Sequence, residues 1–328
     1  MLAMAWREQD IKKEQGTLLE VGWRDACCTY SCTEILFFSQ NPHFIFFMTL
    51  MRSAMLPAGA FAGQVALVTG GGSGLGYGMA SMLSRLGATV AIASRRLPVL
   101  RDAAEAIQQE TGGRVVPIQC DVRHADQVTE AMDTLVDAVG LPDVVINNAS
   151  VIDLSGSLDL SAKKYDLMQG VNVRGTFMLS RAAVPILREA ENPHILSLSP
   201  PLNLSPRWLG GHTGYTLAKY GMTMATLGIG AEFAKDGIAA NTLWPRTTIA
   251  TAAVQFALGG DQMMKVSRTP EIYADAAYEV VTKPSRDYTG QTLIVEDVLE
   301  AAGVTDFSGY AAVPGTPDDQ LFPDIFLD

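Results

Sequence analysis

The feature that most constrains the fold is an apolar run that passes directly into a cluster of glycines. Residues 65–69 form this run, as expected of a buried strand, and apolar residues recur at helical spacing from Tyr77 to Leu86. Because glycine has no Cβ, the backbone between the two can turn sharply and approach a phosphate group. The free N–H groups at the helix start, with the helix dipole behind them, then face the anion. Strand, glycine turn and helix together predict the first half of a dinucleotide-binding unit.

The composition permits a large core and argues against several classes of function. The chain has 328 residues, of which 48% are hydrophobic and 18% charged, so general disorder is not expected. A net charge of −11 argues against binding to nucleic acid or to an anionic membrane surface. The four cysteines form neither a disulfide framework nor a zinc spacing. We therefore expect no metal and a cytoplasmic location, with mitochondrial and peroxisomal locations left open.

Residues 1–56 do not share the pattern of the rest of the chain. They mix charged residues with an apolar, phenylalanine-rich patch over residues 35–48, which is too short and too interrupted to span a bilayer. The segment also contains too many acidic residues for a mitochondrial presequence. We interpret it as a poorly ordered or loosely docked extension without a transmembrane segment, in which the aromatic patch could act as a surface anchor.

From Gly63 onward, strand and helix patterns alternate, and we predict one α/β domain over residues 57–304. The expected fold is a doubly wound, Rossmann-type domain with a seven-stranded parallel sheet and helices on both faces. The predicted strands are 64–69, 88–93, 114–119, 143–147, 194–198, 237–243 and 291–295. The predicted helices include 97–110, 124–139, 160–189, 215–234, 251–258 and 271–282. Residues 305–328, rich in Pro, Gly and Asp, are predicted to form a tail packed on this domain.

Ligands of such a sheet bind beyond the carboxyl ends of its strands, where the second predicted strand ends in Ser94 and Arg95. A carboxylate at this point would bind the adenine-ribose hydroxyls and repel a 2′-phosphate. Arg95 instead offers a planar, permanently charged group suited to phosphate, and Ser94 can add a hydroxyl donor. These residues favour NADP(H) over NAD(H) as the cofactor. The alternative to a phosphate-binding role is a solvated residue at the start of the next helix, and this description suits Arg96 better than Arg95.

Tyr215 and Lys219 form the candidate catalytic pair. Residues four apart share one face of a helix, so the phenol and the ammonium can point at the same reacting centre. A free phenol has a pKa near ~10, which is too high for efficient proton transfer at neutral pH. A neighbouring ammonium and an oxidised nicotinamide both favour the phenolate, so we expect them to lower the pKa of Tyr215. Lys219 can also hold the hydroxyls of the nicotinamide ribose.

The spacing Thr69-Gly70-x-x-x-Gly74-x-Gly76, followed by Tyr215-x-x-x-Lys219, resembles the short-chain dehydrogenase/reductase family. In that family an Asp-Val pair after the third strand holds the adenine ring, which implies this role for Asp121 and Val122. The alternative for Asp121 is an N-cap of the helix that follows. With the family's motifs included, the expected cofactor-binding residues are Thr69, Gly70, Gly72, Ser73, Gly74, Leu75, Gly76, Ser94, Arg95, Asp121, Val122, Asn148, Ala149, Tyr215, Lys219, Pro245 and Thr248.

Two asparagines are also similar to family positions. Asn172 matches a helix asparagine whose backbone carbonyl holds a water that links to the lysine and relays protons. The alternative is a solvated helix residue. Asn148, in Asn-Asn-Ala-Ser, lies where the family has Asn-Asn-Ala-Gly, a motif that steadies the sheet beside the cofactor. Ser150 departs from the usual glycine.

The sequence departs from the family at the serine that usually binds the substrate carbonyl. That position falls on Pro200 when aligned on the strand, or on Leu202 when counted back from the tyrosine, and neither side chain can donate a hydrogen bond. Ser199 is the nearest hydroxyl and the candidate fourth catalytic residue beside Tyr215, Lys219 and Asn172; Asn203 and Ser205 come next. A missing donor of this type costs roughly 10²–10³ in rate, so we expect a slow enzyme rather than an inactive one.

A second departure follows the sixth predicted strand. Pro245 is kept from the family's Pro-Gly pair, but Arg246 replaces the glycine, and Thr248 becomes the candidate contact to the nicotinamide amide. Arg246 could attract an anionic substrate or point to solvent.

Two parts of the chain resemble different branches of the family. Residues 51–148 resemble 2,4-dienoyl-CoA reductases, and residues 149–328 resemble the hydroxysteroid dehydrogenase-like protein 2 group, notably in Ser199–Leu204 and Phe326–Asp328. The resemblance implies an NADP(H)-dependent oxidoreductase that interconverts a carbonyl and a secondary alcohol on a small, lipid-like molecule (fatty acyl or steroid-like). The alternatives are a 2,4-dienoyl-CoA reductase and a weakly active or non-catalytic NADP-binding module. The family also implies homo-oligomers.

Overall fold

The computed structural model describes residues 56–328, so all but the last residue of the predicted extension 1–56 lies outside the described part of the chain. Seven parallel strands form a single sheet in the order β3-β2-β1-β4-β5-β6-β7. The strands are β1 Val65–Thr69, β2 Thr89–Ser94, β3 Val115–Gln119, β4 Val144–Asn147, β5 His194–Ser197, β6 Ala239–Trp244 and β7 Thr292–Ile294. Every strand lies within two residues of its predicted position, and the predicted doubly wound fold is confirmed.

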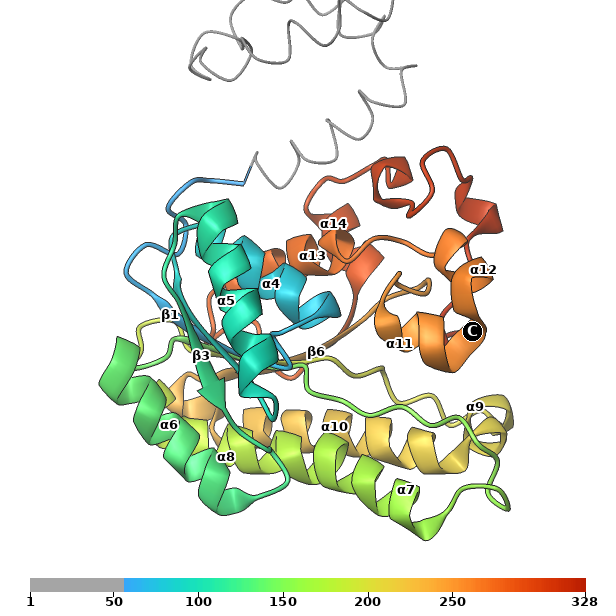
Figure 1. The fold of residues 1–328 in the computed structure, drawn as a ribbon, viewed down its shortest axis with the longest axis horizontal. Helices are drawn as coiled ribbons and strands as arrows, with labels where there is room; N and C mark the ends of the chain where they lie inside the picture. Colours follow the sequence, from blue (N-terminus) through green and yellow to red (C-terminus); the bar gives the residue numbers. More distant parts are fainter. Residues whose placement is uncertain (1–55) are drawn as a thin grey trace, which may run out of the picture. The chain divides into compact units, whose positions relative to one another are not determined.

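Side chains alternate between the two faces along each strand, so both faces of the sheet carry apolar side chains, and helices cover both. On one face, Val68 and Ile92 pack against helices α4, α5, α13 and α14. On the other, Leu67 and Val145 pack against α6, α8 and α10 (Figure 1). The longer helices are α4 Gly74–Arg85, α5 Leu97–Thr111, α6 Ala125–Val139, α8 Thr176–Leu187, α10 Thr213–Glu232 and α13 Glu271–Val281. The shorter ones are α7 Ala162–Met168, α9 Pro206–Gly211, α11 Ala252–Val254, α12 Gly260–Lys265 and α14 Val295–Ala301.

The helices differ from the predictions in three places. The predicted helix 160–189 is α7 and α8 joined by a π-helix over Gln169–Gly175. The predicted helix 251–258 is α11 and a π-helical turn over Gln255–Gly259, and α12, which was not predicted, follows them. α9 and α14 were not predicted, because α9 is only six residues long and α14 begins at Val295 with no intervening turn after β7.

The last residues of the chain run beside the segment that follows β6. The N–H of Thr248 donates to the carbonyl of Phe322 at 2.9 Å, and the N–H of Asp324 donates to the carbonyl of Arg246 at 2.8 Å. Phe326 is fully buried. This C-terminal segment, residues 322–328, is therefore held at the carboxyl edge of the sheet. Among residues 56–328, no helix has both the length and the apolar character needed to cross a membrane.

Candidate active site

A cavity of about 440 Å³ lies beyond the carboxyl ends of the strands. The chain order reverses between β1 and β4, and residues from the ends of both strands line this cavity, as expected for a ligand site of a doubly wound sheet. The lining continues through the turn before α4, the ends of β2 and β3, and helix α10 to the segment after β6.

The glycine turn between β1 and α4 brings backbone close to the cavity. Gly70 and Gly74 have φ values of 68° and 56°, a left-handed conformation that favours glycine. A Cβ at Gly76 would lie 2.5 Å from the carbonyl oxygen of Gly70, so only glycine lets α4 begin this close to the turn. Gly70, Gly72, Ser73, Gly74 and Leu75 line the cavity.

Thr69 and Gly76 are not among the lining residues, and Thr69 instead fixes the ends of two strands. Its hydroxyl donates to the carbonyl of Ile146 and accepts from the N–H groups of Asn148 and Ala149, each at 3.1 Å. The amide of Asn148 donates back to the carbonyl of Thr69 at 2.7 Å. Thr69 thus acts behind the cavity, while Asn148 and Ala149 line it. We predicted that Thr69 contacts the cofactor; the structure instead gives it the structural role of joining the ends of β1 and β4.

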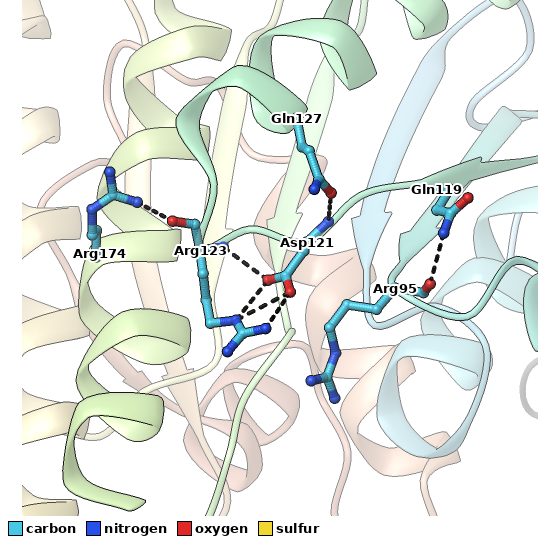
Figure 2. Close-up of polar contacts among 6 residues, drawn as sticks. All are labelled: Arg95, Gln119, Asp121, Arg123, Gln127 and Arg174. Carbon is cyan, nitrogen blue, oxygen red and sulfur yellow. Dashed lines mark hydrogen bonds and ion pairs between the residues drawn. The ribbon is translucent and has the colours of Figure 1, made fainter. Parts of the chain in front are cut away.

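Arg95 is exposed and lines the cavity beside Ser94. Figure 2 shows its guanidinium and the Asp121–Arg123 pair extending in the same direction from the ends of β2 and β3. The Asp121 carboxylate accepts from the Arg123 guanidinium at 2.6 to 3.1 Å, and this bonding lowers the pKa of Asp121. Asp121 and Val122 both line the cavity. The N-cap of α6 is His124, so the alternative role of Asp121 as N-cap is wrong.

Tyr215 and Lys219 project from α10 into the cavity, and both are buried. The Nζ of Lys219 donates to the carbonyl of Leu198 at 2.8 Å and lies 5.2 Å from the centre of the Trp244 ring. Burial lowers the pKa of Lys219 to about 7, an effect that the carboxylate of Asp324 opposes. A lysine with this pKa is charged for only part of the time at neutral pH.

The pKa of Tyr215 differs from the expectation. Burial raises it above the ordinary value for a phenol, and the nearby Asp324 carboxylate raises it further. The expected lowering by Lys219 is therefore wrong for the protein alone, because loss of solvation outweighs the attraction of a lysine that is itself buried.

Asn172 lies in the π-helix between α7 and α8 and is fully buried. Its side chain accepts from the N–H of Val151 at 2.8 Å and donates to the carbonyl of the same residue at 3.0 Å. The alternative of a solvated asparagine is wrong. This pairing fixes the segment that follows β4, whose residues Ser150 and Val151 line the cavity.

The structure does not bring Ser199 into the cavity. Its buried hydroxyl accepts from the hydroxyl of Thr223 on α10 at 3.0 Å, and of residues 198–205, all of them described, only Leu198 lines the cavity. Ser197 makes the equivalent contact with Thr226 at 2.7 Å. The two serines are two positions apart and face α10 together, which the alternation of a strand could have indicated. The predicted role of Ser199 is corrected on this geometry.

The segment after β6 corrects the prediction for Thr248 and decides between the two alternatives for Arg246. The Thr248 hydroxyl bonds with Ser267 at 2.8 Å and its N–H is used by Phe322, so Thr248 does not line the cavity. Arg246 is exposed and its guanidinium pairs with Asp297, which settles the open alternative in favour of the solvent side. Pro245 does line the cavity.

Sequence reasoning missed Asp324 and Ile325, which enter the cavity from the C-terminal segment. Burial raises the pKa of Asp324 to about 7. It also missed Trp244 and Tyr273, which line the cavity from β6 and α13. The resemblance at Phe326–Asp328 gave the C-terminal segment no role in the site, and its composition indicated only a tail.

The sequence and the fold are similar to those of known proteins. A family model described as short chain dehydrogenase matches residues 64–258. Hydroxysteroid dehydrogenase-like protein 2 of Danio rerio is 44% identical over 276 residues, which cover 82% of this chain and 65% of that protein. This match is longer than residues 149–328, so the likeness is not confined to the second part of the chain. The chain spans just under two thirds of that relative's length.

Two solved structures extend these matches. A short chain dehydrogenase from Mycobacterium thermoresistibile is 46% identical with a TM-score of 0.76, covering 82% of this chain and 96% of that one. A metagenomic short-chain oxidoreductase in complex with NADP is 25% identical with a TM-score of 0.60, covering 72% of this chain and 97% of that one. Together with the cavity described above, these matches establish that the chain belongs to the short-chain dehydrogenase family of oxidoreductases.

Proposed function

We propose that this protein is an NADP(H)-dependent oxidoreductase that interconverts a carbonyl and a secondary alcohol on a lipid-like substrate. The observation that carries the proposal is that Tyr215 and Lys219 line the same cavity as the glycine turn and Arg95. A proton-transferring pair and a phosphate-binding turn thus share one space of a size suited to small molecules.

The residues present fit a dinucleotide cofactor that carries a 2′-phosphate. The glycine turn, which a Cβ at Gly76 would obstruct, opens onto the cavity at the start of α4, where free N–H groups favour an anion. Arg95 and Ser94 would hold the 2′-phosphate, and Asp121 and Val122 would lie beside the adenine. The structural relative solved with NADP supports the same cofactor. When bound, the nicotinamide supplies or accepts a hydride.

The proton is handled by this chain's own residues. The Tyr215 hydroxyl gives its proton to the carbonyl oxygen during reduction and takes the hydroxyl proton during oxidation. Lys219, fixed by the carbonyl of Leu198, lies one helical turn further along α10 and holds positive charge near the phenol when protonated. Asn172 holds the wall of the cavity through Val151 and supports the proton relay.

The remaining lining supports an apolar substrate. Side chains that line the cavity without polar groups include Ile152, Ile249, Val254, Leu258 and Ile325. Burying an apolar chain against such residues is favourable, by roughly 25 cal/mol per Å² removed from water. A fatty acyl or steroid-like molecule has the matching chemistry.

Calorimetric titration with NADPH and NADH tests the cofactor assignment. Wild type should bind NADPH more tightly than NADH, and Arg95→Ala should lose about 10- to 100-fold in NADPH affinity, as expected for a charge-assisted contact. Arg101→Ala, at an exposed position of α5 outside the cavity lining, is the matched control and should bind as wild type does. Failure of wild type to bind either cofactor would overturn the proposal.

Turnover assays separate the alternative activities. Carbonyl reduction consumes NADPH and forms a secondary alcohol, whereas reduction of a 2,4-dienoyl-CoA also removes the ultraviolet absorption of the conjugated chain. The hydroxyl of Ser199 lies outside the cavity, and this geometry favours a weakly active or non-catalytic module as the second candidate. NADPH binding without turnover of any carbonyl or dienoyl compound would establish that candidate.

A further inference from the structure

Asp324 enters the catalytic cavity from a segment that follows Tyr215 by more than one hundred residues. Its position is fixed by the backbone, since its N–H donates to the carbonyl of Arg246 at 2.8 Å. The next peptide is held by the indole of Trp244, which donates to the carbonyl of Ile325 at 3.0 Å. The Asp324 side chain is held as well, because its Oδ1 accepts from the N–H of Ile325 at 2.7 Å, and the residue lines the same cavity as Tyr215 and Lys219.

The end of β5 supplies no polar side chain to this cavity. Pro200 has neither a hydroxyl nor an N–H, and the Ser199 hydroxyl is turned toward Thr223 on α10. Within the described residues 198–205, only Leu198 lines the cavity. A substrate oxygen bound by Tyr215 would therefore lack a second hydrogen-bond partner from β5.

We propose that the carboxyl group of Asp324 makes this second polar contact to the substrate oxygen, in place of the hydroxyl that position 200 lacks. As a carboxylic acid it donates a hydrogen bond to the carbonyl oxygen of a substrate that is being reduced. As a carboxylate it accepts a hydrogen bond from the hydroxyl of a substrate that is being oxidised. This inference rests on the proposed function.

The groups around Asp324 allow both its carboxylic acid and its carboxylate form near neutral pH. Tyr215 and Lys219 from α10, Tyr273 from α13 and Glu296 from α14 interact electrostatically with Asp324. Burial raises the pKa of Asp324 to about 7; Glu296 contributes to this rise, while the hydrogen bond from the N–H of Ile325 and the charge of Lys219 oppose it. The guanidinium of Arg246, on the adjoining segment, pairs with Asp297. A carboxylic acid that its site keeps neutral is an effective hydrogen-bond donor in other enzymes.

Three variants assayed across pH with NADPH and the carbonyl compound reduced fastest by wild type test the proposal. Asp324→Ala should lower kcat about 10²–10³-fold, as for loss of other such donors. Asp324→Asn should keep most of the rate, because its amide still donates, and should lack the decline with rising pH that Asp324 gives wild type. Asp319→Asn, at an exposed position, should behave as wild type. Retained NADPH affinity in each variant shows that the fold is intact.

Two outcomes of the assays would overturn the proposal. Wild-type kinetics in Asp324→Ala would mean that the carboxyl group makes no contact that matters to the reaction. A loss in Asp324→Asn as deep as that in Asp324→Ala would mean that the group transfers a proton rather than donating a fixed hydrogen bond.

Infrared difference spectra between wild type and Asp324→Asn give a readout independent of turnover. A band from a protonated carboxyl should be present below neutral pH and absent above it. Turnover without this band would overturn the role of Asp324 while leaving the proposed function intact. The band without any carbonyl turnover would overturn the proposed function, and the role of Asp324 with it.

Discussion

The ring of Phe326 stacks on the ring of Tyr215, with their centroids 6.1 Å apart and their planes inclined by 27°. Trp208, Tyr220 and Trp244 surround the same phenylalanine at centroid distances of 5.2 to 6.1 Å. Phe326 also has a φ of 76°, a left-handed conformation that is costly for a residue with a Cβ. This aromatic cluster therefore holds the C-terminal segment against the proposed proton donor.

Phe326→Ala should destabilise the protein by about 3–5 kcal/mol, because it removes a fully buried ring and leaves a cavity beside Tyr215. Urea denaturation followed by tryptophan fluorescence measures this change. Phe322→Ala is the matched control, since that residue is 46% exposed and loss of its ring should cost about 1 kcal/mol or less. Equal losses in the two variants would show that the cluster does not anchor the segment.

Two alanine substitutions on α4 should differ in their effect: Gly76→Ala should weaken NADPH binding, whereas Gly78→Ala should stabilise the helix. Gly76→Ala places a Cβ 2.5 Å from the Gly70 carbonyl oxygen, so the turn or the helix must shift, and NADPH affinity should fall at least tenfold. Gly78→Ala meets only Pro270 at 3.6 Å and should stabilise the helix by up to about 1 kcal/mol. Calorimetric binding and thermal denaturation of both variants check the pair. Unchanged NADPH binding in Gly76→Ala would contradict the close approach of α4 to the turn.

Ser199→Ala should leave kcat within about twofold of wild type, because its hydroxyl contacts Thr223 rather than the cavity. The lost hydrogen bond should lower the free energy of unfolding by about 1 kcal/mol. Steady-state kinetics and urea denaturation test the two effects separately. A fall in kcat of about 10²-fold or more would restore Ser199 as the donor to the substrate carbonyl.

Tyr215→Phe should remove carbonyl reduction almost completely while NADPH binding stays close to wild type. The substitution deletes only the hydroxyl, so the packing of the ring against Phe326 is kept. Single-turnover NADPH oxidation and calorimetric binding on the same preparation separate chemistry from affinity. Reduction that persists at the wild-type rate would rule out Tyr215 as the proton donor.

His194 should make the protein sensitive to mild acid. Burial lowers the pKa of this fully buried side chain to about 4, below its ordinary value of about 6.5. The unfolded chain therefore binds a proton that the folded protein excludes between these two pH values. The free energy of unfolding should fall as pH drops through this window, by up to about 1.4 kcal/mol per pH unit.

His194→Gln should flatten this slope, since glutamine keeps an N–H for the Lys283 carbonyl but does not titrate in this range. Denaturation series at several pH values between about 4 and 6.5 compare the two proteins. Identical slopes would mean that other groups account for the whole acid dependence.

Much of the fold follows from local sequence alone. Strands β1, β2 and β4 are short apolar runs buried on both faces, so their positions are readable without knowing their partners. The glycine turn and the Tyr215–Lys219 spacing are equally local, because a strand–turn–helix unit and one turn of α10 fix their geometry. The sequence therefore predicted the seven-stranded sheet and the cavity residues that lie on these elements.

The rest of the site depends on contacts between distant segments. The direction of Ser199 at the end of β5 is decided by the hydroxyl of Thr223 on α10, and that of Thr248 by Ser267. Asp324 and Phe326 reach Tyr215 only because backbone hydrogen bonds draw the C-terminal segment along the chain after β6. A segment rich in Pro, Gly and Asp has no periodicity that shows what it packs against. Its place in the active site was therefore decided by tertiary structure.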